Sequence, residues 1–151
     1  MRSYFNRAAF LLSAAMLAFA LTTGSAEAKR TGDDLMITID VESQTMEVVV
    51  EGRVRHRWPV STGRDGYETP GGSYRPVRLE KQWFSTQYDD APMPNSVFFS
   101  GGYAIHGTTD TRNLGRPASH GCVRLSPRNA ATLFALVSDY GHRRTRIVVA
   151  E

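Results

Sequence analysis

The sequence predicts a mainly β domain, a sandwich or barrel-like sheet, with one principal α-helix near 127–140. Many short apolar runs are separated by Gly and Pro turns, which is the pattern of a sandwich or barrel. Only the stretch near 127–140 repeats its apolar residues at helical spacing. The length of 151 residues, with 41% hydrophobic and 22% charged residues, favours a single globular domain.

The N-terminal region has the features of a secretory signal peptide over residues 1–28. An apolar run over 8–21 follows Arg2 and Arg7, and Ala26-Glu27-Ala28 has the spacing of a cleavage site. The run is shorter than the roughly 20 residues of a membrane span, so no stable membrane anchor is expected after cleavage. We therefore expect an exported protein of the periplasm or cell envelope, with a short leader over 29–34 and the folded domain over 35–151.

The predicted strands come from alternating or continuous apolar segments bounded by turn residues. The first three form a meander, and Gly52 supplies a turn that tolerates positive φ. Pro76 argues that its segment lies at an edge or a bulge. The predicted strands are 35–40, 45–50, 54–60, 74–79, 97–99, 103–106 and 144–149.

Two long segments between these strands are predicted to be irregular. Residues 80–96 are rich in aromatic and proline residues, and a loop of this length in a small domain is usually a functional cover. We interpret residues 80–96 as a lid over the site. Residues 107–118 form a polar loop that leads into the stretch with the only cysteine.

The helix has clear start and stop signals. Ser126 suits the N-cap and Pro127 the first helical position. Gly141 is placed to end the helix in a left-handed conformation. The apolar residues that share one helical face are Ala130, Leu133, Phe134, Leu136, Val137 and Tyr140.

Charge and cysteine usage narrow the functional classes. The net charge is only +3, with both signs interspersed, so nucleic acid is not an expected partner. Exported proteins usually pair their cysteines in disulfides, but Cys122 has no partner in this chain. A lone thiol in an exported protein is reactive, intermolecular or incidental.

The residues around Cys122 suggest an activated nucleophile. His106 ends a predicted strand and is the favoured base, and His120 is an orienting or oxyanion-side group. The amides of Gly121 and Cys122 are candidates for stabilising an oxyanion. Arg124 offers a planar fork to a substrate carboxylate.

Two other interpretations of Cys122 remain open from the residues alone. A single cysteine is commonly a small buried hydrophobe. His106, His120 and Cys122 together would supply three zinc ligands, but no fourth ligand or usual paired spacing appears.

The stretch Ser119-His120-Gly121-Cys122-Val123-Arg124-Leu125, with His106-Gly107-Thr108 upstream, resembles the signature of the L,D-transpeptidases with a YkuD-type catalytic domain. Thr69-Pro70-Gly71-Gly72-Ser73-Tyr74 and the helix start at Ser126 are also similar to that family. The resemblance covers roughly residues 35–150.

The resemblance implies a β-sandwich-like fold and an envelope enzyme of peptidoglycan synthesis and cell-shape maintenance. Cys122 would form a thioester with residue three of a donor stem peptide and transfer it to an amine of a neighbouring stem, giving a 3→3 crosslink. His106 would be the catalytic histidine, oriented by the backbone carbonyl of Gly107. The pocket-forming positions would be Ser119, His120, Gly121 and Arg124. The resemblance implies no metal or cofactor, and we expect a monomer.

Two alternatives use the same residues differently. Water would resolve the acyl-enzyme in an L,D-carboxypeptidase, which leaves a trimmed stem peptide. A non-catalytic cell-wall-binding protein would need an unreactive Cys122. The sequence predicts transpeptidation with peptidoglycan stems as donor and acceptor.

Overall fold

The alternating apolar residues of the first predicted strands form an antiparallel meander in the computed structural model, which describes residues 33–151. The three strands are β1 (Leu35–Asp40), β2 (Thr45–Val50) and β3 (Arg53–Pro59). In β1 and β2 every second side chain is buried, as the alternation predicts. The predicted signal peptide (1–28) and the first four residues of the predicted leader lie outside the described residues.

Two residues of the predicted leader form ion pairs with the folded part of the chain. Asp33 pairs with Arg75 and Arg146, and Asp34 pairs with Arg144. Asp33 is thereby bound to β9 through Arg146, and Asp34 to the turn before it through Arg144.

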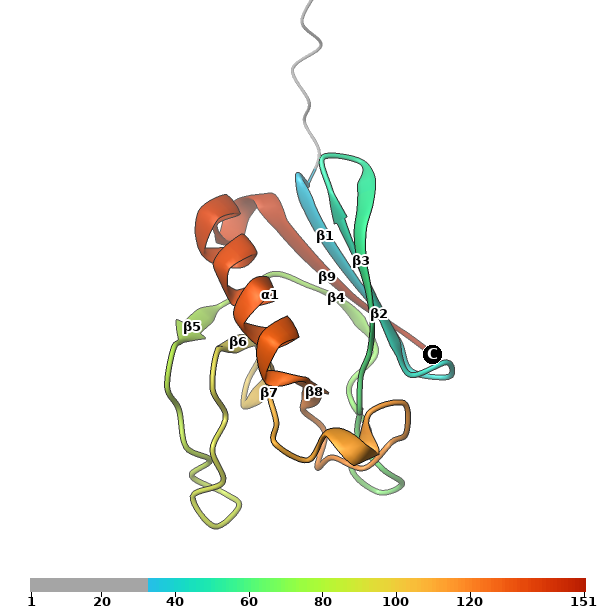
Figure 1. Cartoon of the computed structure of the whole chain (residues 1–151), viewed down its shortest axis with the longest axis vertical. Helices are drawn as coiled ribbons and strands as arrows, with labels where there is room; N and C mark the ends of the chain where they lie inside the picture. Colours follow the sequence, from blue (N-terminus) through green and yellow to red (C-terminus); the bar gives the residue numbers. More distant parts are fainter. Residues whose placement is uncertain (1–32) are drawn as a thin grey trace, which may run out of the picture. The chain divides into compact units, whose positions relative to one another are not determined.

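The meander is part of a five-stranded sheet in the order β3-β2-β1-β9-β4 (Figure 1). Strand β9 (Thr145–Ala150) pairs in parallel with β1 and antiparallel with β4 (Gly72–Tyr74). The alternation of the predicted strand 54–60 places Val54 on its buried face, but this side chain is half exposed. The register shifts between Val48 and Val49 opposite it, which turns Val54 away from the core.

A second sheet carries four strands in the order β5-β6-β7-β8. They are β5 (Arg78–Glu80), β6 (Ser96–Ser100), β7 (Tyr103–Gly107) and β8 (Val123–Leu125). The prediction of one strand over 74–79 is wrong, because the chain leaves the first sheet after Tyr74 and joins the second at Arg78. Pro76 lies in this crossing, where a missing N–H interrupts no ladder.

Helix α1 (Pro127–Tyr140) has the predicted boundaries. Ser126 caps it by accepting a hydrogen bond from the Asn129 amide at 3.3 Å. Gly141 follows with a φ of 76°, as predicted, but its ψ of 166° is extended rather than left-handed helical. Two short 3-10 turns, η1 (Thr111–Asn113) and η2 (His142–Arg144), complete the described elements.

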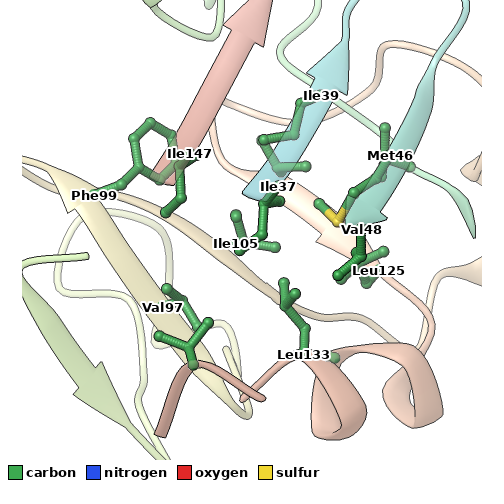
Figure 2. Packing of buried hydrophobic residues seen from close by; sticks show 14 of the residues in the cluster. Ile37, Ile39, Met46, Val48, Val97, Phe99, Ile105, Leu125, Leu133 and Ile147 are labelled. Carbon is green, nitrogen blue, oxygen red and sulfur yellow. The ribbon is translucent and has the colours of Figure 1, made fainter. Parts of the chain in front are cut away.

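The core lies between the two sheets and the buried face of α1. Figure 2 shows side chains from both sheets converging on Leu133 of α1. Strand β6 is buried along four consecutive residues, so it lacks the alternation of β1 and β2. This mainly β sandwich with one principal helix confirms the predicted fold class. The labelled core residues are Ile37, Ile39, Met46, Val48, Val97, Phe99, Ile105, Leu125, Leu133 and Ile147.

Candidate active site

Parallel pairing of β7 and β8 brings together residues that are far apart in the sequence. His106 is the register partner of Arg124, and Gly107 is the partner of Leu125. Cys122 immediately precedes β8 and lines the same cavity as His106. Strand β8, which follows both candidate histidines, was not predicted, because three residues are too short to show a period.

His106 is held in one orientation. Its Nδ1 lies 2.8 Å from the carbonyl oxygen of Gly107, the contact that the family resemblance implies. A carbonyl only accepts, so Nδ1 donates and Nε2 of the neutral ring is left as the acceptor. The side chain is 6% exposed, and this burial lowers its pKa to about 4, against the hydrogen bond to Gly107 and together with the charge of Arg124.

Cys122 is a free cysteine at the edge of a small apolar cluster. It packs beside Met93, Phe98 and Ala104. Its Sγ lies 3.9 Å from the carbonyl oxygen of Gly102. Burial raises the pKa of the Cys122 thiol, and a backbone hydrogen bond at Ala104 and the charge of Arg124 offset part of this rise.

These two shifts describe the resting state of the pair. The pKa of the thiol is above its ordinary value, and the pKa of the imidazole is well below its ordinary value. At neutral pH the resting site therefore holds a thiol and a neutral imidazole rather than a thiolate and an imidazolium.

The turn before Cys122 is closed by Ser119. Ser119 Oγ donates to the Cys122 carbonyl at 2.5 Å and accepts from the Gly121 amide at 3.0 Å. The sequence suggested that the Gly121 amide faces an oxyanion, but in the structure this N–H is already satisfied by Ser119. Gly121 has a φ of 107°, and a Cβ there would lie 2.5 Å from a ring carbon of Tyr103. Gly121 therefore allows the tight turn that precedes Cys122.

A second loop supports this turn from behind. The carbonyl of Thr62 accepts from the amides of Ala118 and Ser119. Thr69 Oγ1 donates to the Gly121 carbonyl at 2.8 Å and accepts from the Gly63 amide at 2.9 Å. Thr69 belongs to the Thr-Pro motif noted in the sequence, and its role here is to hold the turn.

His120 lies on the other side of the turn. Its Nε2 is 2.8 Å from Arg64 Nη2. Tyr88 stacks on its ring at a centroid distance of 4.3 Å, and Tyr67 meets it edge-on at 4.8 Å. Burial and the charges of Arg64 and Arg124 lower the pKa of His120.

The matching family model describes the L,D-transpeptidase catalytic domain, YkuD, and it covers residues 34–149. The chain belongs to the YkuD family. L,D-transpeptidase 1 of Mycobacterium tuberculosis (strain ATCC 25618 / H37Rv) is 29% identical over 126 residues, which are 74% of this chain and 50% of that protein.

Solved YkuD-type structures have the same fold. An L,D-transpeptidase from Stackebrandtia nassauensis matches with a TM-score of 0.70 and 26% identity over 86% of this chain and 62% of that one. The L,D-transpeptidase LdtMt1 in complex with imipenem matches with a TM-score of 0.69 and 25% identity over 79% of this chain and 60% of that one. The chain thus spans between half and two thirds of the length of these relatives.

The YkuD cavity of this chain has a volume of about 580 Å³, and most of the predicted site residues line it. Two predicted residues, Gly107 and Gly121, act through backbone groups outside its lining. Residues 80–96 supply much of the wall, as expected for a cover. The predicted site residues that line the cavity are His106, Ser119, His120, Cys122 and Arg124.

Two arginines of the YkuD site were not predicted from the sequence. Arg78 lines the cavity between the rings of Trp83 and Phe98, at 4.3 and 3.9 Å from their centroids. Arg64 contacts His120 from a loop that precedes it by 56 residues. Neither arginine has a local motif, and both contacts depend on long-range pairing that spacing along the chain does not reveal.

The described part of the YkuD domain has neither a cluster of metal ligands nor a membrane-spanning helix. Within residues 33–151, no three His, Cys, Asp or Glu side chains are grouped as metal ligands. No helix in this described part of the chain is both long and apolar enough to cross a membrane.

Proposed function

We propose that this protein is a peptidoglycan L,D-transpeptidase with Cys122 as nucleophile and His106 as the group that moves the proton. The observation that carries the proposal is the pairing of β7 with β8. It puts the neutral, Gly107-anchored imidazole and the only thiol of the chain in one cavity. Membership of the YkuD family and the 29% identity to an L,D-transpeptidase support it.

The reaction has two acyl transfers. The sulfur of Cys122 attacks the carbonyl carbon of residue three in a donor stem, and His106 Nε2 takes the thiol proton. The C–N bond to the terminal D-residue breaks, and the leaving amine takes the proton from His106 as the thioester forms. An amine of a neighbouring stem then attacks the thioester, its proton passes through His106, and Cys122 is released as the thiol.

Because the resting pair is uncharged, substrate binding would have to promote the proton transfer from Cys122 to His106. Thiol and imidazole are both neutral before the reaction, so the nucleophile forms only as the proton moves. A bound stem peptide that displaces water and places its carbonyl beside Cys122 would couple proton transfer to attack. Arg124 favours the developing thiolate by its charge.

The remaining pocket residues position the substrate. Ser119 holds the turn, His120 faces the cavity as an oxyanion-side donor, and Arg124 binds a stem carboxylate. Export is proposed from the signal peptide over 1–28, which would deliver the enzyme to the cell envelope where stem peptides occur.

The test is product analysis on purified disaccharide-tetrapeptides with the purified protein. The expected products are a 3→3 crosslinked dimer and free D-amino acid, identified by mass spectrometry, and Cys122→Ala should form neither while keeping its circular dichroism spectrum. A product that is only the tripeptide would replace transpeptidation with hydrolysis. Equal activity in Cys122→Ala would refute both.

A second measurement separates catalysis from simple wall binding. We expect imipenem to add one covalent equivalent at Cys122 and none to Cys122→Ala, as read from intact mass. A protein that binds sacculi but takes up no imipenem and forms no product would be a binding module.

A further inference from the structure

Three side chains that surround His120, those of Arg64, Tyr67 and Tyr88, have no role in the reaction described so far. One ring nitrogen of His120 is hydrogen-bonded to Arg64. Tyr88 stacks on a face of the ring, and Tyr67 contacts the ring edge-on. Arg64 lies in a different loop from His120, and Tyr88 comes from the cover segment 80–96. Three separate segments of the chain therefore meet at one imidazole.

Arg64 is fixed at both ends. Its backbone N–H donates to the carbonyl of Ser119 at 3.1 Å. Its guanidinium carbon lies 4.4 Å from the centroid of the Tyr67 ring. A cation anchored in this way loses little additional side-chain entropy when it also contacts His120.

The contact determines where the proton of His120 resides. A guanidinium has only N–H donors and keeps its charge, so Arg64 Nη2 donates and His120 Nε2 accepts. A ring nitrogen that accepts carries no proton, and the neutral ring then carries its proton on Nδ1. With Nε2 occupied, Nδ1–H is the one ring N–H that His120 can offer to the cavity that it lines.

A hydrogen-bond donor on His120 matters because the turn before Cys122 offers fewer free backbone N–H groups to an oxyanion than the sequence suggested. The Gly121 N–H is already taken by Ser119 Oγ. Charge that develops on the carbonyl oxygen of a stem peptide needs fixed donors to be stabilised.

We propose that Arg64 is a positioning residue that locks His120 as the neutral Nδ1–H tautomer, so that His120 presents one fixed N–H donor to the oxyanion of the acyl-transfer steps. This rests on the proposed function. Tyr88 and Tyr67 hold the ring in place, and the lock is present before substrate binds.

The test combines a spectroscopic readout with kinetics. Long-range ¹H–¹⁵N spectra of the ¹⁵N-histidine-labelled protein distinguish the two tautomers, and the His120 signals are assigned by their loss in His120→Gln. We expect an Nδ1–H pattern in the wild type and in Arg64→Lys, which keeps a charged donor. In Arg64→Met, which keeps the stem over Tyr67, we expect the Nε2–H pattern and titration of His120 at a higher pH.

The kinetic arm measures thioester formation with a tetrapeptide donor. Loss of one oxyanion donor costs roughly 10²–10³ in kcat, so Arg64→Met should lose about 10²-fold in kcat with KM little changed. Arg64→Lys should recover most of this rate. Arg128→Met, an exposed arginine on α1, is the matched control and should behave as the wild type.

Each result has one meaning. An Nε2–H pattern in the wild type, an unchanged pattern in Arg64→Met, or a changed pattern with unchanged kcat would overturn the proposal. A wild-type protein with the Nδ1–H pattern but no acylation would overturn the proposed function instead, because the tautomer is read without substrate. Circular dichroism of both variants excludes a misfolded protein as the cause.

Discussion

His106 and Arg124 face each other as register partners on neighbouring parallel strands, so a permanent positive charge lies beside a buried imidazole. This charge disfavours a proton on His106 and favours a thiolate at Cys122. Burial acts on both groups and favours their neutral forms. Proton transfer from Cys122 to His106 is thus unfavourable in the resting site. Arg124 lowers the free energy of the thiolate once a substrate is present.

Alkylation of the resting enzyme should report this state. We expect iodoacetamide to react slowly with Cys122 near pH 7, and the rate should rise with pH through and beyond the ordinary thiol range near 8.5, because only the thiolate reacts. Intact-mass kinetics at a series of pH values measure it. Arg124→Met should move the profile to higher pH by removing the favourable charge. Fast alkylation at pH 6 would contradict the neutral pair.

Stability should depend on pH through His106. Its pKa is near 6.5 in the unfolded chain and about 4 in the folded protein, so between these values the unfolded chain binds more protons. The free energy of unfolding should therefore fall as pH falls from 6.5 to 4, by about 3 kcal/mol in full. Urea unfolding at several pH values tests this. His106→Asn should show a shallower fall, and an unchanged slope in that variant would contradict the assignment.

Gln44 connects the first turn of the domain to the loop behind the active site. It is 3% exposed, its Oε1 accepts from the Thr62 amide at 2.9 Å, and its Nε2 donates to Thr62 Oγ1 at 2.6 Å. Gln44→Leu would leave a buried amide without a partner, at a cost of about 1–3 kcal/mol. We expect this loss in urea unfolding and a lower kcat, because Thr62 supports Ser119.

The exposed neighbour Ser43 provides the control for this variant. Ser43→Ala should change the free energy of unfolding by no more than about 0.5 kcal/mol, as surface substitutions usually do. If Gln44→Leu is as stable and as active as Ser43→Ala, the hydrogen bonds to Thr62 neither stabilise the fold nor support the site.

Tyr88 is the contact between the cover segment and the proposed oxyanion side. Its stacking on His120 should contribute about 0.5–1.5 kcal/mol. Tyr88→Ala should therefore lower kcat/KM by roughly threefold to tenfold, at a cost of 1.4 kcal/mol per tenfold. Phe84→Ala is the matched control, since Phe84 lies in the same segment, is 56% exposed and does not line the cavity. Equal effects of the two substitutions would refute a specific role for Tyr88.

The sequence predicted those elements whose signal is local. The alternation over 35–40 and 45–50 gave the bounds of β1 and β2, and Ser126 with Gly141 gave the ends of α1. The family motifs named residues that the structure gathers in one cavity, including His106 and Cys122.

Long-range contacts decide those parts of the structure that the sequence did not predict. The segment 74–79 is uniformly extended, so nothing in its composition shows that it changes sheets at Pro76. The satisfied amide of Gly121 depends on a side chain two residues away in a turn of unusual φ. Nothing in the sequence around Arg64 indicates its contact with His120, which is 56 residues away.

The place of β9 in the first sheet has a consequence for how the protein folds. It is inserted between β1 and β4, and Arg144, which immediately precedes it, contacts Asp34, 110 residues away. The first sheet therefore cannot be completed until the last strand of the described chain is available, and contacts of such long range slow folding. During synthesis, β1 and β4 would lack the strand that joins them until residues 145–150 have been made. Slow completion of this kind would suit the export across a membrane that is proposed above.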